Sequence, residues 1–232
     1  MKRGAAADSL RRVHDEVVVC RKCPRLVEWR ERVAREKVAR FANEDYWGRP
    51  LPGFGDPRAR VLIVGLAPAA HGGNRTGRIF TGDSSGDFLF ASLNRTGFAS
   101  QATSVAPDDG LRVADAYIAA VNRCAPPANA PTPAERDNCL PYLVRELALL
   151  TGVRPIVALG QYAWNGVLLA AAALGHVVRP KPKFGHGAEA EVGPYALLGA
   201  YHPSQQNTFT KTLTPEMLDD VFLHARRVAE GR

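Results

Sequence analysis

The chain has 232 residues, of which 46% are apolar, and it carries a formal net charge of +7. This length allows one large domain or two small ones, and the apolar share is sufficient for a full hydrophobic core. The positive charge favours a polyanionic partner, with nucleic acid ahead of an acidic membrane surface. The longest apolar run, 167–174, is too short to cross a bilayer, and the first 20 residues lack the apolar stretch of a secretory signal. These features predict a soluble protein of a reducing compartment, where structural disulfides are rare.

Helices and strands are expected to alternate along most of the chain. Short apolar runs separated by helical segments predict a mostly parallel, four-stranded sheet with helices on both faces, which is a three-layer α/β/α sandwich. No composition shift divides the chain, so one domain over 1–232 is expected. The chain order is helix 8–19, helix 25–40, a Pro/Gly-rich loop 41–58, strand 60–65, helix 83–96, strand 115–121, helix 132–150, strand 154–159, helix 162–174, a basic Pro/Gly loop 180–187, strand 195–200 and helix 214–229.

Four cysteines occur in two pairs. Cys20 and Cys23 form a C-x-x-C that Pro24 follows, and Cys124 and Cys139 form a wider pair later in the chain. Four thiolates that converge on one point can hold a metal ion or an iron–sulfur cluster, and spaced pairs in an intracellular chain usually bind metal. Two disulfides or four unrelated buried thiols are the alternatives. The spacing does not separate zinc from iron, because C-x-x-C serves both.

Parallel sheets bind ligands at the carboxyl ends of their strands, and two of these ends carry informative residues. The first leads into a long loop, 65–83, whose glycines allow close approach of the backbone to a ligand. In this loop Phe80 offers an aromatic plate, and Asp83 either caps the next helix or serves as a functional carboxylate. His202 directly follows the last strand, where it can donate a hydrogen bond to a developing anion. The polar run 204–208 suits contacts with a phosphate backbone or a groove.

These motifs together resemble family 5 uracil-DNA glycosylases, the B-type enzymes of prokaryotes. The resemblance extends from Cys20 to the last helix, and it implies the α/β/α sandwich of that superfamily and a [4Fe–4S] cluster. The ligands would be Cys20, Cys23, Cys124 and Cys139, and the cluster would tie the N-terminal helices, 8–40, to the rest of the chain. The matching motifs are G-L-A-P-A-A-H-G-G-N-R-T-G-R-x-F-T-G-D at 65–83, H-P-S-Q-Q-N-T at 202–208, G-F-G-D-P-x-A-R-V-L at 53–62 and R-C-A-P-P at 123–127.

The resemblance also implies an enzyme that extrudes uracil from duplex DNA and hydrolyses its N-glycosidic bond to leave an abasic site. Phe80 would stack on the base, and His202 would donate a hydrogen bond to the base oxygen that gathers charge. Related glycosylases of families 1 and 4 carry an acidic residue where this chain has Leu66. Those of family 4 also carry a uracil-reading Asn where it has Ala120. Asp83 is the expected replacement for the acid, acting on water or on the sugar cation.

Loss of the amide that reads uracil should relax the choice of base, so hypoxanthine and other deaminated purines are expected substrates beside uracil. Asn122 is a candidate to compensate in part for the missing amide. The base is expected to contact Gly65, Leu66, Ala67, Phe80, Ala120 and Asn122. The DNA is expected to contact Arg75, Arg78, Ser204, Gln205, Gln206 and Asn207, the last three in the minor groove.

Two other classes stay open from the residues alone. A non-catalytic, metal-stabilised nucleic-acid-binding module would bind DNA without producing abasic sites. An iron–sulfur electron carrier would show reversible cluster reduction and would not need His202. The resemblance favours the enzyme. It is expected to be a monofunctional glycosylase that acts as a monomer on double-stranded DNA, away from membranes, in the cytoplasm at the nucleoid of a prokaryote, with a structural cluster.

Overall fold

The centre of the structure, a computed structural model that describes residues 7–232, is a six-stranded sheet. The strands are β1 (Phe54–Gly55), β2 (Val61–Gly65), β3 (Ala116–Ala120), β4 (Pro155–Leu159), β5 (Glu189–Val192) and β6 (Tyr195–Ala200). Their order in the sheet is β1-β3-β2-β4-β6-β5. The four central strands are parallel, and β1 and β5 pair antiparallel at the two edges.

The central strands are short apolar runs that the helices bury on both faces. Every residue of β2, β3 and β4 is buried, and so is most of β6. Continuous runs of this kind suit a parallel sheet, because neither face meets water. The register places Gly65 opposite Ala120 and Leu159 opposite Ala200. The carboxyl ends of all four central strands therefore meet at one edge of the sheet, where the expected site residues follow.

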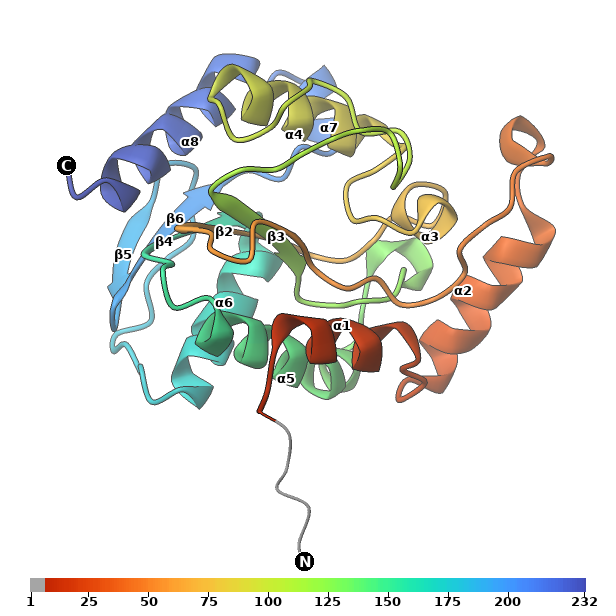
Figure 1. Ribbon diagram of the computed structural model, residues 1–232, viewed down its shortest axis with the longest axis horizontal. Coiled ribbons are helices and arrows are strands. Elements are labelled where there is room, and N and C mark those ends of the chain that lie inside the picture. The colour runs from red at the N-terminus through yellow and green to blue at the C-terminus, as the bar shows by residue number, and fades with distance from the viewer. Residues whose placement is uncertain (1–6) are drawn as a thin grey trace, which may run out of the picture.

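Helices cover both faces of the sheet (Figure 1). They are α1 (Leu10–Val18), α2 (Pro24–Glu36), α3 (Gly73–Thr76), α4 (Ser84–Arg95), α5 (Pro133–Leu149), α6 (Gln161–Ala173), α7 (Gln205–Phe209) and α8 (Pro215–Ala229), with 3-10 turns at Ala39–Phe41 and Pro127–Asn129. Side chains of α4 and α8 share one core with Ile63, and those of α5 and α6 share the other core with Val64. Successive residues of β2 thus point to opposite faces.

The first helix is attached to α5 by an apolar and an ionic contact. Val13 and Val17 pack into a small core with residues of α5. Arg145 of α5 donates hydrogen bonds to the carboxylates of Asp8 (2.7 Å) and Glu16. The α1–α5 contact therefore forms from protein side chains alone. The further expectation that a cluster ties 8–40 to a single domain over 1–232 stays a prediction, and residues 1–6 lie outside the described part.

The predicted three-layer α/β/α fold is confirmed, with six strands in place of the expected four. The four predicted strands are the central ones, and the two additional strands are short edge strands. β1 has only two residues, and β5 alternates exposed glutamates with partly and fully buried residues. Neither has the apolar run that identifies a central strand. Among residues 7–232, no helix is long and apolar enough to span a membrane.

Candidate active site and cysteine site

Phe80 lies at the edge where the central strands end, directly against the last residue of β2. A Cβ atom added to Gly65 would come within 2.7 Å of Phe80 Cζ, so the ring covers the glycine at the exit of the strand. The Phe80 ring is buried, and its centroid is 6.1 Å from that of the His202 ring, at an interplanar angle of 36°. The structure therefore brings together the aromatic plate and the hydrogen-bond donor that the sequence places 122 residues apart.

His202 follows β6 and contacts the end of β4. A Cβ atom on Gly160 would lie 3.3 Å from His202 Cβ, and Asn207 Nδ2 donates a hydrogen bond of 2.9 Å to the His202 carbonyl. Burial lowers the pKa of His202 to about 4. The imidazole is consequently neutral at neutral pH. One of its two ring nitrogens then carries a proton and can act as a hydrogen-bond donor.

Asp83 is both the N-cap of α4 and a half-buried carboxylate at the end of the long loop. Its Oδ1 accepts a hydrogen bond of 2.9 Å from the Gly86 N–H, which confirms the capping alternative. Its Oδ2 faces Gly72, where an added Cβ would lie only 1.8 Å away. Burial raises the pKa of Asp83, while the N–H groups of α4 and the Arg75 guanidinium act in the opposite direction. Capping and a catalytic role are compatible, because the cap engages Oδ1.

The residues expected to contact the base edge offer few free hydrogen-bonding groups. Ala120 is fully buried opposite Gly65, while Leu66 and Ala67 are half-buried at the start of the loop. Asn122 is fully buried, and its Oδ1 accepts a hydrogen bond of 2.7 Å from the Tyr162 hydroxyl on α6. Its Nδ2 has no partner among residues 7–232. Since no part of Asn122 reaches solvent, contact with a base would require a local rearrangement.

Arg75 and Arg78 are buried and hold the long loop together. Arg75 pairs with Glu44 and donates a hydrogen bond of 2.8 Å to the Gly82 carbonyl. Arg78 pairs with Asp109 at 2.7 Å, and both of these side chains are buried. The charges of both arginines are thus paired with acidic side chains of the same chain. This arrangement argues against the expected phosphate contacts of these two arginines, which the sequence could not show because their acidic partners lie on distant loops.

The polar run after His202 forms the short helix α7. Ser204 caps it, because its hydroxyl accepts a hydrogen bond of 3.3 Å from the Asn207 N–H. Since Asn207 also bonds the His202 carbonyl, it supports the histidine from within the protein. Gln205 and Gln206 are exposed. They are the members of this run that remain available to DNA.

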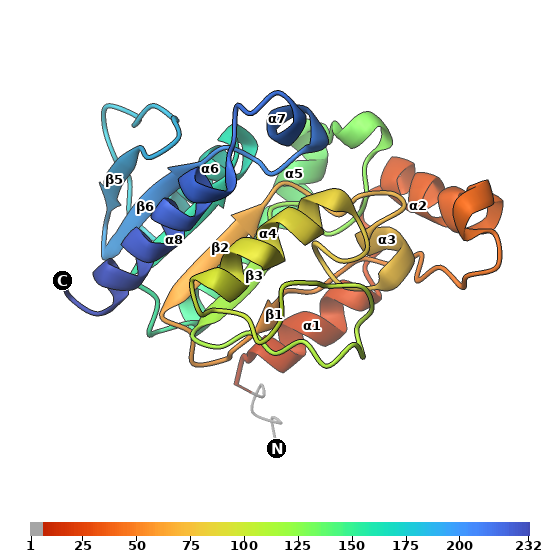
Figure 2. The same ribbon diagram turned by 90° about the horizontal axis from the view of Figure 1, so that it is seen from above.

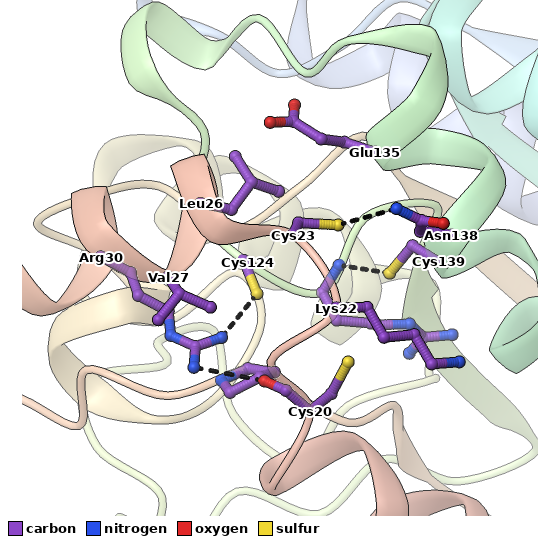
Figure 3. Close-up of a pocket in the computed structure, with 12 residues that line it drawn as sticks. Cys20, Lys22, Cys23, Leu26, Val27, Arg30, Cys124, Glu135, Asn138 and Cys139 are labelled. Carbon is purple, nitrogen blue, oxygen red and sulfur yellow. Dashed lines mark hydrogen bonds between the residues drawn. The ribbon is translucent and has the colours of Figure 1, made fainter.

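The four cysteines line a single pocket, although they come from three separate segments: the connection between α1 and α2, the segment after β3, and α5 (Figure 3). All four are free thiols, so the two-disulfide alternative does not apply to this structure. Cys23 is the N-cap residue of α2, and Cys139 belongs to α5. The two pairs that are far apart in sequence thus face the same space. Among residues 7–232, no three His, Cys, Asp or Glu side chains are placed to hold one metal ion.

Buried cationic and amide groups donate hydrogen bonds to the cysteine sulfurs. Arg30 Nη1 lies 2.9 Å from Cys124 Sγ, and the Arg123 N–H lies 3.2 Å from Cys139 Sγ. Both guanidinium groups are buried, and each has further N–H groups without a partner among the described residues. The Arg123 guanidinium is paired with the buried Glu146, whereas Arg30 reaches only the partly exposed Glu31, at 3.8 Å. A buried cation such as Arg30 is costly unless further negative charge lies nearby. Four thiolates with an anionic iron–sulfur cluster would supply this charge, so the residues present fit such a group.

The comparisons with known proteins identify the family. Residues 52–226 match the uracil DNA glycosylase superfamily. The chain therefore belongs to this superfamily. It is 55% identical over 225 residues to the type-5 uracil-DNA glycosylase of Mycobacterium tuberculosis, covering 96% of this chain and 83% of the relative. It is 50% identical over 214 residues to that of Thermus thermophilus, covering 92% and 95%.

A more distant relative helps to place the chain within the superfamily. The type-4 uracil-DNA glycosylase of Pyrobaculum aerophilum is 32% identical over 152 residues, covering 65% of this chain and 60% of the relative. The type-5 enzyme of the same organism is 44% identical over 213 residues, covering 91% and 89%. Within the superfamily, the chain is thus a member of the type-5 family. This confirms the resemblance drawn from the motifs.

Proposed function

We propose that the chain is a DNA-repair enzyme that hydrolyses the bond between uracil and deoxyribose and leaves an abasic site. One observation carries the proposal. Phe80 and His202 lie together at the strand ends of a type-5 family member, and Asp83 follows Phe80 by three residues in the loop. A stacking plate, a neutral donor and a carboxylate are the groups that cleavage of an N-glycosidic bond requires. The leaving base becomes an anion while the sugar becomes a cation.

Each of these three residues has one task in the proposed reaction. The uracil leaves the base stack of the duplex and stacks on Phe80. As the bond to C1′ lengthens, His202 donates a hydrogen bond to the base oxygen that gains charge, and this bond strengthens towards the transition state. Asp83 opposes the developing positive charge on the sugar and orients the attacking water. A neutral His202 suits this task, because its ring N–H can donate a hydrogen bond to the uracil anion without transferring its proton.

Hypoxanthine is a proposed second substrate. The support for this is the methyl side chain of Ala120, which offers no hydrogen bond to a base edge, and the burial of Asn122 against Tyr162. A site that hydrogen-bonds one base edge strongly rejects others, whereas an apolar wall discriminates weakly. An excision assay with duplexes that contain uracil or hypoxanthine tests this. Activity confined to uracil would contradict it.

We infer that Cys20, Cys23, Cys124 and Cys139 hold a [4Fe–4S] cluster. The support is the single pocket that they line and the hydrogen bonds that the buried Arg30 guanidinium and the Arg123 backbone N–H donate to two of the sulfurs. The bound cluster would supply iron–thiolate bonds that join the start of α2 to α5, which is a structural role. Purified protein should be brown, and Cys23→Ala should lose the visible absorbance. Colourless protein that contains zinc would support the alternative metal.

The decisive experiment is incubation with a uracil-containing duplex, followed by alkaline cleavage at abasic sites. Asp83→Asn is the informative variant, because asparagine caps a helix as well as aspartate does but carries no charge. We expect it to keep the stability of the wild type and to lose about 10²-fold or more in rate. His202→Ala should lose a comparable factor. DNA binding without abasic sites would favour the non-catalytic module, and reversible cluster reduction without base excision would favour the electron carrier.

The proposed setting is double-stranded DNA, on which the protein acts as a monomer at the nucleoid of a prokaryotic cell. The net charge of +7 supports a polyanionic partner. Analytical ultracentrifugation with and without duplex DNA tests the monomer. A dimer at working concentration would contradict it.

A further inference from the structure

The loop between α6 and β5 displays three exposed cations. Arg179, Lys181 and Lys183 are all exposed, and none of them forms an ion pair within the described part of the chain. The next acidic residue, Glu189, instead contacts His224 of α8 at 3.0 Å. Three like charges within five residues give this loop a local positive potential that attracts anions.

The residues between these cations fasten the loop to the protein. Trp164 Nε1 donates a hydrogen bond of 3.1 Å to the Pro182 carbonyl. The Phe184 ring packs edge-on against Trp164, with centroids 6.0 Å apart, and lies 6.2 Å from the Tyr201 ring. Partly buried Pro182 and Phe184 alternate with exposed Lys181 and Lys183. This alternation fixes the backbone while it keeps both ammonium groups in solvent.

The same loop is also fixed against the end of β6. A Cβ atom on Gly199 would lie 2.3 Å from the Gly185 carbonyl oxygen, so the two backbones are in direct contact. The Gly187 N–H donates a hydrogen bond of 2.8 Å to the Gly199 carbonyl, and the Tyr201 N–H donates one of 3.2 Å to His186 Nδ1. Tyr201 immediately precedes His202. Figure 2 shows this loop, which leads into β5, along the same edge of the molecule as α7.

We propose that Arg179, Lys181 and Lys183 bind the phosphate backbone of duplex DNA beside the base that enters the site. The inference rests on the proposed function. The loop is already held in place, so binding would order little more than the ends of the side chains. It also assigns the phosphate contacts to a part of the chain other than Arg75 and Arg78, whose charges are paired within the protein.

The test compares two double variants in binding to a fluorescent, undamaged duplex at KCl concentrations from 50 to 200 mM. Lys181→Ala/Lys183→Ala removes two of the proposed contacts. Arg58→Ala/Arg112→Ala is the matched control. It removes two exposed cations without ion-pair partners in the described part, located next to the amino ends of β2 and β3. Both double variants reduce the net charge by two.

We expect the lysine variant to bind more weakly and to show a slope of log K against log salt that is shallower by about 2. The control should keep the slope of the wild type. Equal slopes for the wild type and the lysine variant would overturn the inference, and so would an equal change in the control. Lys183→Glu should weaken binding further than Lys183→Ala. This binding measurement needs no catalysis. A wild-type protein that does not excise uracil would therefore refute the proposed function, but the DNA-binding test of the loop could still be carried out.

Discussion

Substitution of Gly72 by alanine tests the position of Asp83 without touching the carboxylate itself. A Cβ atom at this position would lie 1.8 Å from Asp83 Oδ2 and 2.7 Å from its Cγ. Real Cβ atoms essentially never approach closer than 3.0 Å, so Oδ2 must retreat by at least 3.0 − 1.8 = 1.2 Å. The three atoms nearest to this added Cβ all belong to the Asp83 side chain, so the alanine displaces the carboxylate.

The displacement predicts a large effect on rate and a smaller one on stability. A misplacement of about 1 Å in a catalytic arrangement can reduce the rate by about 10²-fold. If the carboxylate rotates away from Gly86, the N-cap of α4 is lost as well, which costs about 1 kcal/mol. We expect Gly72→Ala to resemble Asp83→Asn in rate and Asp83→Ala in stability.

The assay combines single-turnover excision of uracil with urea unfolding. Gly185→Ala serves as the matched control, because its Cβ would meet only Ala188 Cβ at 3.8 Å, an ordinary contact. It should change neither the rate nor the free energy of unfolding by much. A Gly72→Ala enzyme that folds normally and excises uracil at the rate of the wild type would refute the role given to Asp83.

Three further predictions concern buried groups. Burial lowers the pKa of His202 from 6.5 to about 4, so the unfolded chain takes up a proton before the folded chain does as the pH falls. The free energy of unfolding should therefore drop by up to about 3 kcal/mol between pH 6.5 and 4. Urea titrations should show that the free energy of unfolding depends less on pH in His202→Asn than in the wild type. The same pH dependence in both proteins would refute this. Glu146→Gln leaves the buried Arg123 without its counterion and should cost about 3–5 kcal/mol in the same titrations; a loss below about 1 kcal/mol would mean that another group balances Arg123. Gly65→Ala would place a Cβ 2.7 Å from the Phe80 ring and should reduce kcat/KM for a uracil duplex at least about tenfold, whereas unchanged kinetics would argue against stacking on this ring.

The central strands were predictable because their signal is local and strong. The predicted strand at 60–65 is β2 at Val61–Gly65, and the predicted strand at 195–200 is β6. Each is a continuous apolar run that a glycine, a proline or a charged residue bounds. The edge strands lack such runs. β5 pairs with β6 through backbone hydrogen bonds at positions that a single sequence does not distinguish from a loop.

The site was predictable in outline but not in its electrostatics. The position of His202 follows from the rule that ligands bind where parallel strands end. The partners of the arginines do not follow from any local pattern, because Arg75 pairs with Glu44 and Arg78 with Asp109 across long loop segments. From sequence alone, a basic residue in a functional loop can equally be a phosphate contact or one half of an internal ion pair. Only the fold decides between them.

The glycines of the long loop have a different role from the one their composition suggests. The sequence predicts a backbone that approaches a ligand, yet Gly65 makes room for the ring of Phe80 and Gly72 makes room for the carboxylate of Asp83. The small residues thus bring the protein's own reactive groups close to the ends of the strands. With alanine at position 120, this side of the site offers no side-chain hydrogen bond to the base edge. In the proposed reaction, discrimination would then come from stacking area, from the fit against the backbone and from the donor at His202, which every base with a suitably placed carbonyl oxygen can satisfy. A broad range of deaminated bases is the expected consequence of that geometry.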